Sequence, residues 1–465
     1  MKRFLILCVL IAGIAAVALP QAATGAADVQ IPPFTTHTLG NGLTVVLMEY
    51  HQLPLVELVM TVGGGRALEP DSLTGLASMT AELLRQGTQT RTATQIAEQV
   101  DFVGGVLRTS AGLDQFTISG EFLTKDLPAG LALFSDVILH PVFPQEEIDR
   151  ERSQRLATLE SIKEEPGNIA SIAYNRRVYG MHPYGRQALG THASLPRMTR
   201  DAIIAFERQT FVPNNALLVV VGDFQEKAML ASVESAFGMW PRGTAPSVPS
   251  VAPKRISGRH VVIIDKPDVT QSQIRIGNTG VDILNPDRYT LQVANTILGG
   301  GFTSRLVEEI RVKRSLTYGA NSSFASARQG GTFTVSTFTK NRSLRTTIDV
   351  ALAELKKIRE HGVSAAELSK AQNYIAGSFA RNLQAPENLA AQLSTMLFYH
   401  LPDDYLRGYV RRIHAVTLAD INRVVPKDIP YDDLLILVVS NPAETRAQLE
   451  GLGPIEVVPL NAAVE

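Results

Sequence analysis

The chain has 465 residues, of which 44 are Lys or Arg and 45 are Asp or Glu, so its formal net charge is −1. This length exceeds one ordinary core, because domains cluster near ~100–200 residues, and two or more domains are expected. Hydrophobic residues make up 45% and charged residues 19%, which excludes a disordered or collagen-like chain. Without a basic excess, a nucleic-acid-binding protein is not expected.

The first 26 residues have the composition of a secretory signal peptide. Lys2 and Arg3 precede an apolar run over 4–19, and small residues follow up to Ala26. The run is shorter than the ~20 residues of a spanning helix, and an uncleaved membrane anchor is the alternative. Cys8, the single cysteine, lies in this segment. We therefore expect an exported mature chain, periplasmic or otherwise secreted, without disulfides, thiol nucleophiles or thiolate metal sites.

A proline-rich segment divides the rest of the chain. Residues 241–256 contain four prolines and little hydrophobic periodicity, which indicates an extended linker. We expect an N-terminal domain over 30–240 and a C-terminal domain over 257–445.

The two parts contain the same predicted elements in the same order. In the first part these are strands at 43–48, 115–120 and 216–221, a helix beginning near 74, a long charged helix at about 145–163, the segment 166–170, and a helix after Thr199. In the second part they are strands at 260–264, 331–336 and 434–439, a helix near 288, a long helix at about 365–382, the matching segment 386–390, and a helix after Thr417. This repeat predicts two duplicated α+β domains, each a mostly antiparallel sheet with helices packed on it.

Residues 75–88 (GLASMTAELLRQGT) carry a resemblance to a known family. They resemble the segment that holds the H-x-x-E-H zinc motif in the pitrilysin/insulinase metallopeptidases, or inverzincins. The resemblance extends over nearly the whole mature chain, through 183–185, 213–214 and 221–223. It is closest to the short two-domain chains related to mitochondrial processing peptidase.

The motif itself is degenerate. The resemblance implies histidine ligands at Ser78 and Glu82 and a general-base glutamate at Ala81, and none of these residues is present. A serine hydroxyl is a poor zinc ligand, and alanine cannot accept a proton from water. The family's third ligand is a glutamate on the long helix, where Glu151 and Glu160 match only loosely. We therefore expect no metal bound by this chain.

No other catalytic motif replaces the lost one. No two of the nine histidines are three or four residues apart, and no G-x-S-x-G elbow or P-loop is present. His182 is expected in a loop, and residues 63–65 (GGG) at the end of a strand.

The second part contains a glycine-rich turn at Gly299, Gly300 and Gly301, followed by Arg311 and Tyr318. From the residues alone, this is a turn and an amphipathic helix with a solvated face. The resemblance instead implies that the glycines help to bind substrate. It also implies that the Arg311 and Tyr318 side chains reach a substrate at the zinc site, where donors stabilise a developing oxyanion.

Three functional hypotheses follow. The first is a non-catalytic subunit of an exported heterodimeric peptidase, with zinc in a paralogous partner chain and with Arg311 and Tyr318 acting on the partner's extended peptide substrate. The second is a peptide-binding or scaffold protein of the same fold, which holds peptides at strand edges. The third is an active metallopeptidase with oxygen ligands around Glu82 and Glu160.

Overall fold

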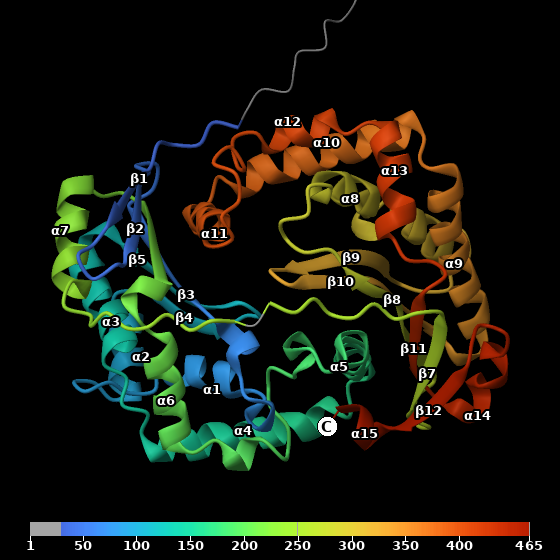
Figure 1. Ribbon diagram of the computed structural model, residues 1–465, viewed down its shortest axis with the longest axis horizontal. Helices are drawn as coiled ribbons and strands as arrows, with labels where there is room; N and C mark the ends of the chain where they lie inside the picture. Colours follow the sequence, from blue (N-terminus) through green and yellow to red (C-terminus); the bar gives the residue numbers. More distant parts are fainter. Residues whose placement is uncertain (1–28, 249, 465) are drawn as a thin grey trace, which may run out of the picture.

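The computed structural model describes residues 29–248 and 250–464, so the predicted signal peptide lies outside the described residues. Two six-stranded sheets form the framework (Figure 1). The first has the order β1 (Thr35–Thr38), β2 (Thr44–Glu49), β6 (Ala216–Gly222), β3 (Leu55–Gly63), β5 (Gln115–Leu123) and β4 (Val106–Ala111). The second has the order β12 (Ile455–Pro459), β7 (Arg259–Asp265), β11 (Leu434–Ser440), β8 (Gln271–Gly280), β10 (Gly330–Lys340) and β9 (Ala320–Ala327).

Most neighbouring strands are antiparallel, and only β2/β6, β7/β11 and β7/β12 are parallel. Strands β2 to β6 correspond in order to β7, β8, β9, β10 and β11, which confirms the predicted α+β fold with two similar domains. The two sheets differ at one edge, where β1 pairs antiparallel with β2 but β12 pairs parallel with β7. Strand β12 also lies beyond residue 445, where the second domain was expected to end.

The helices follow the same repeat. The first half contains α1 (Leu76–Leu83), α2 (Ala93–Phe102), α3 (Leu127–Leu139), α4 (Gln145–Ile162), α5 (Pro166–Tyr179), α6 (Arg200–Thr210) and α7 (Glu226–Phe237). The second contains α8 (Arg288–Asn295), α9 (Leu344–His361), α10 (Ala365–Asn382), α11 (Pro386–Phe398), α12 (Tyr409–Ala415), α13 (Leu418–Asp428), α14 (Pro442–Thr445) and α15 (Leu460–Val464). Helices α5 and α11 each begin at a proline, whose missing N–H costs nothing at the first helical position.

Residues 63–65 were expected at the end of a strand, and β3 does end at Gly63, but the rest of β3 and the central strand β8 were not predicted. Strand β3 is apolar except for Glu57 and Thr61, and both of these are buried. Strand β8 is mostly polar and has Ile274 and Ile276 as its large apolar residues, so neither strand shows a sustained alternation of apolar and polar residues.

Each half covers one face of the other half's sheet with a helix. Helix α5 of the first half packs on β8 and β11 of the second sheet, and α11 of the second half packs on β3 and β6 of the first (Figure 1). The residues that form these two cores are Val46, Val59, Val219, Leu389 and Leu393 at α11, and Ile169, Tyr174, Val262, Leu437 and Val439 at α5. Strands β6 and β11 are therefore buried at every residue.

The contact of α5 with the second sheet is equivalent to that of α11 with the first, but the side chains that meet there differ in size. Tyr174 on α5 donates a hydrogen bond to the Phe333 carbonyl at 2.8 Å, and a Cβ at Gly277 would lie 2.4 Å from the tyrosine oxygen. In the other half, the equivalent residues Ser394 and Thr61 share a hydrogen bond of 2.6 Å. A large residue therefore faces glycine in one half, and two small residues face each other in the other half.

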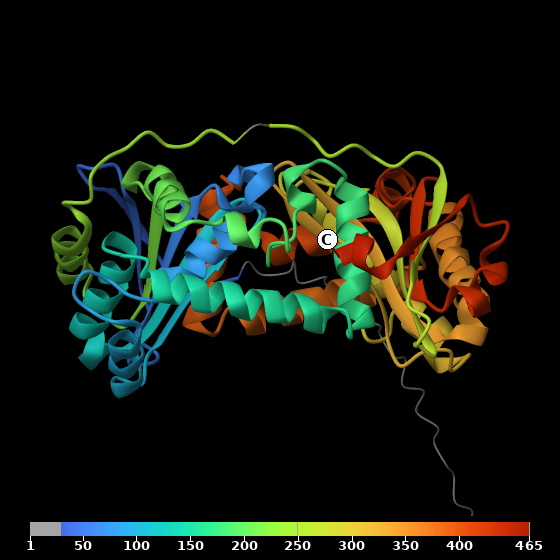
Figure 2. The ribbon, with the colours of Figure 1, turned by 90° about the horizontal axis from the view of Figure 1, so that it is seen from below.

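Residues 241–248 and 250–257 contain no helix or strand, and they run along one side of the molecule between α7 and β7 (Figure 2). Across the described part of the chain, none of the helices is both long and apolar enough to span a bilayer.

Candidate functional site

The degenerate motif lies on α1, and the start of this short helix is closely held. Gly75 has φ +94°, and a Cβ there would lie 2.5 Å from the Gly190 nitrogen, so only glycine fits. The Glu69 carboxylate accepts hydrogen bonds from the Gly75 and Ala77 N–H groups at 3.1 and 2.9 Å. Burial raises the pKa of Glu69 to about 7, although these two bonds favour its charged form. Gly75 is therefore explained by close packing within the fold.

The Ser78 hydroxyl is engaged by other protein groups. It donates to the Ala188 carbonyl and accepts from Nη1 of Arg155 at 2.8 Å. Arg155 lies on α4, is 7% exposed, and its Nε donates to Glu151 at 2.6 Å. A buried guanidinium, balanced by Glu151, therefore contacts the first position of the lost motif.

The other motif positions do not supply metal ligands either. Ala81 is buried, and its methyl group has no donor or acceptor. Glu82 forms an ion pair with Arg85 in the turn that follows α1. Glu160 lies on α4 with 58% of its side chain exposed, and it pairs with Lys163 and His192 at 2.9 and 2.7 Å.

These residues do not fit a catalytic zinc. Such a site needs three ligands with free lone pairs and an open position for water. Here the hydroxyl is engaged, both candidate glutamates of α4 are ion-paired, and a second cation beside Arg155 would be repelled. Within the residues that the structure describes, no group of three or more His, Cys, Asp or Glu side chains is placed to hold a metal ion.

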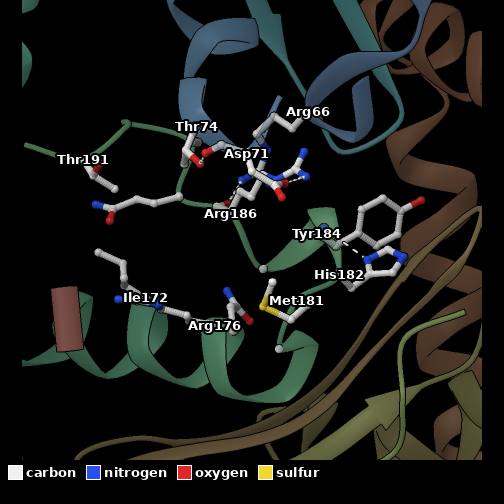
Figure 3. Close-up of a pocket in the computed structure, with 15 residues that line it drawn as sticks. Arg66, Asp71, Thr74, Ile172, Arg176, Met181, His182, Tyr184, Arg186 and Thr191 are labelled. Atoms are coloured by element: carbon white, nitrogen blue, oxygen red, sulfur yellow. Dashed lines mark hydrogen bonds and ion pairs between the residues drawn. The ribbon is translucent and has the colours of Figure 1, made fainter. Parts of the chain in front are cut away.

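A cavity of about 400 Å³ adjoins this motif, between α5 and the loops that follow it (Figure 3). Arg66, Arg176 and Arg186 line it, together with Asp71, which is ion-paired with Arg186. Burial lowers the pKa of Arg66. Because three arginines and one aspartate line it, the cavity has a cationic wall, which suits an anionic group such as a carboxylate.

His182 stands at the mouth of this cavity as a loop residue, as expected. Its Nδ1 accepts from the Tyr184 N–H at 3.1 Å, and its Nε2 faces the Val251 carbonyl at 2.7 Å. This ring connects the 180–186 loop to the linker.

In the second half, Gly299 and Gly300 are the last residues of a π-helical segment, Thr296–Gly300, and Gly301 follows it. A Cβ at Gly299 would lie 2.4 Å from the Ser322 nitrogen of β9, so this glycine permits close packing of the segment on the sheet. Gly300 is exposed and Gly301 is half-buried. Close packing thus explains Gly299 without a ligand.

Arg311 and Tyr318 lie on and after a second π-helical segment, Val307–Val312. The Arg311 guanidinium lies over the Phe302 ring, 5.0 Å from its centroid. The Tyr318 side chain is 85% exposed. The Tyr318 side chain is therefore presented at the surface of this chain, whereas Arg311 is half-buried.

The loop that carries Tyr318 is held firmly, although the side chain itself is exposed. Ser315 adopts φ +51°, which turns the chain back toward β9. The buried hydroxyls of Thr337 and Thr339 on β10 donate to the carbonyls of Gly319 and Leu316, at 2.9 and 2.8 Å. The backbone is thus tied to the sheet on both sides of Tyr318, which fixes where its exposed side chain leaves the surface.

Sequence reasoning missed Arg155, Thr337 and Thr339. Arg155 lies four residues after Glu151, a spacing that is typical of an exposed ion pair on a helix. The two threonines continue an alternating strand, where inward polar residues were not expected. The alternation of the strand puts both threonines on one face, and this was the sequence signal that could have indicated a shared role.

Two family models match the chain: one described as Insulinase (Peptidase family M16) over residues 44–192, and one as Peptidase M16 inactive domain over residues 197–375. Uncharacterized zinc proteases of Mycobacterium leprae and Streptomyces coelicolor are 26% and 25% identical, over 83% and 84% of this chain and 87% and 86% of their own.

Solved structures agree with these matches. A peptidase M16 inactive domain from Pseudomonas fluorescens superposes with a TM-score of 0.83 and 26% identity, covering 88% of this chain and 98% of that one. The first half of the periplasmic protease PqqL from Escherichia coli has a TM-score of 0.74 at 18% identity, over 91% and 95%. The second likeness bears on the fold alone.

Proposed function

The chain belongs to the insulinase (M16) family of peptidases, and on this premise we propose that it is a non-catalytic subunit of an exported zinc metallopeptidase. The zinc would be bound by a paralogous partner chain, and Arg311 and Tyr318 would contact the extended peptide substrate at the partner's active site. One observation carries this proposal: the first half has Arg155 where a zinc site would need ligands, while the second half exposes Tyr318 on a turn that is tied to the sheet.

The chemistry of the two side chains supports this role. A guanidinium offers several N–H donors in a rigid fork, and a phenol offers one O–H donor. Donors aimed at a developing oxyanion contribute to turnover, and losing one typically lowers the rate by ~10²–10³. Such donors need not come from the chain that binds the metal.

The test is to purify this chain with its zinc-bearing paralogue and to measure cleavage of an unstructured peptide. We expect Arg311→Ala and Tyr318→Phe each to lower kcat by roughly 10²-fold with the complex intact. Arg446→Ala, an exposed arginine of the same half, is the matched control and should leave kcat unchanged. Unchanged turnover in both site variants would show that the two side chains have no catalytic role.

Export and domain organisation belong to the same proposal. We propose that residues 1–26 are removed and that domains over 30–240 and 257–445, with the added β12, are joined by the 241–256 linker. N-terminal sequencing of the protein from a periplasmic fraction tests the cleavage. A retained Met1 would contradict it.

A scaffold or peptide-binding role without enzymology is the second candidate. Strands β4 and β9 are the outermost strands on one side of their sheets, and such edges accept an added strand. Recovery of homo-oligomers alone from the native source would favour this candidate. A co-purifying zinc-bearing chain would favour the subunit.

A further inference from the structure

A cavity of about 560 Å³ lies in the second half, between the two π-helical segments and the helices α9 and α10. We call it the α9–α10 cavity. Its lining includes Ile297, Phe302, Arg305, Glu354, Ala371 and Tyr374. This volume is within the range of ~300–1,000 Å³ that is typical of ligand sites.

The repeat explains why this space is open. Helices α4 and α10 begin at Gln145 and Ala365, so Glu151 corresponds to Ala371. In the first half, Glu151 and its partner Arg155 fill the space between α1 and α4. In the second half the equivalent residue is an alanine, and the facing segment is wound as a π-helix, which is frequent at functional sites.

Two buried polar atoms on the cavity wall have no partner among the described residues. One is Nη1 of Arg305, whose other nitrogens are held by Glu367 at 2.7 and 2.9 Å. The other is Oε2 of Glu354, a residue that is 6% exposed and whose Oε1 lies 3.8 Å from Lys357. The wall thus offers one free donor and one free acceptor. Buried polar groups left unpaired are uncommon and costly.

The mouth of the cavity is aromatic. Phe302 is 74% exposed and Tyr374 is 53% exposed, although both are large apolar residues. Ile297 and Ala371 continue this apolar surface inward. A ligand that fits must therefore combine an apolar group with both an N–H donor and a carbonyl acceptor.

We propose that the α9–α10 cavity is a second peptide-binding site, which holds a segment with an apolar or aromatic side chain. One backbone amide of the peptide donates its N–H to Glu354, and a carbonyl accepts from Arg305. The side chain packs between Phe302 and Tyr374. The proposal rests on the proposed function only for the peptide nature of the ligand, and it involves no cleavage.

Burial of Glu354 raises the pKa of its carboxyl group, so a donor that approaches it relieves an unfavourable charge. The lining carries charges of both signs: Arg305 is paired with Glu367 and Lys313 with Glu309, and Glu308, Lys357 and Lys370 also line the cavity. A neutral peptide amide suits this wall better than a free ion of either sign.

The experiment is calorimetric titration of the isolated chain, residues 27–465, with an acetylated and amidated alanine pentapeptide that has phenylalanine at its centre. We expect saturable binding that weakens roughly 10-fold or more in Glu354→Leu and in Tyr374→Ala. Methylation of the peptide's amide nitrogens beside phenylalanine should weaken binding similarly. Phe102→Ala, an exposed aromatic of the first half, is the matched control.

Absence of saturable binding, or equal affinity in the wild type and both cavity variants, overturns the proposal. Tyr374 is half-exposed, so its variant decides the question even if Glu354→Leu fails to fold. Because this titration uses neither a partner chain nor turnover, its outcome is separate from that of the subunit assay.

Discussion

Glu57 makes the packing of α11 on the first sheet dependent on pH. It lies in the central strand β3 and is 3% exposed, on the face that α11 covers, where Thr61 meets Ser394. Glu121 is directly opposite it on β5. Burial, followed by repulsion from Glu121 and Glu387, raises its pKa to about 8.

The magnitude follows from this pKa. The ordinary value is 4.5, so folding favours the protonated form of Glu57. Its contribution to stability is complete below pH ~4.5 and is lost as the pH rises toward about 8, because the unfolded chain ionises first. Between pH 5 and 9 this costs roughly 4 kcal/mol. Glu57→Gln, which stays neutral, should not incur this loss.

The assay is urea unfolding at pH 5, 7 and 9 of the wild type, Glu57→Gln and Glu98→Gln, an exposed control on α2. We expect the free energy of unfolding of Glu57→Gln, relative to that of the wild type, to rise by roughly 4 kcal/mol from pH 5 to pH 9, while Glu98→Gln follows the wild type. Other buried acids contribute equally to both proteins, so the difference isolates Glu57. If the two proteins lose stability in parallel, the carboxylate is solvated and the reasoning is wrong.

Two further predictions concern other buried contacts. The triple variant Ser78→His, Ala81→Glu, Glu82→His should not bind stoichiometric zinc, because the Arg155 guanidinium remains beside residue 78, as metal analysis of the purified protein would show. Gly277→Ala should lower the free energy of unfolding by about 2 kcal/mol or more, since its Cβ would lie 1.9 Å from the Phe333 oxygen, and a thermal melt that matches the wild type would contradict this.

Much of the candidate site could be identified from the sequence, because the chemical groups present at each position are read directly from the residues. Ser78 and Ala81 stand where the family resemblance implies a histidine and a glutamate, and that comparison needs no coordinates. The helix after Thr199 was also predicted, and α6 begins there, with the Thr199 hydroxyl accepting a hydrogen bond from the Ala202 N–H. The glycines at 299–301 were assigned to substrate binding, but the side chain missing at Gly299 is explained by its contact with β9.

The sequence alone determined the duplication, the α+β class and the loss of the zinc motif, because patterns of apolar residues and residue identity are local properties. Only the tertiary structure decided that α5 and α11 exchange sheets, that Arg155 contacts Ser78, and that Thr337 and Thr339 hold the turn around Tyr318. These contacts join residues that are far apart along the chain. Their formation depends on how whole elements pack, which no short stretch of sequence contains.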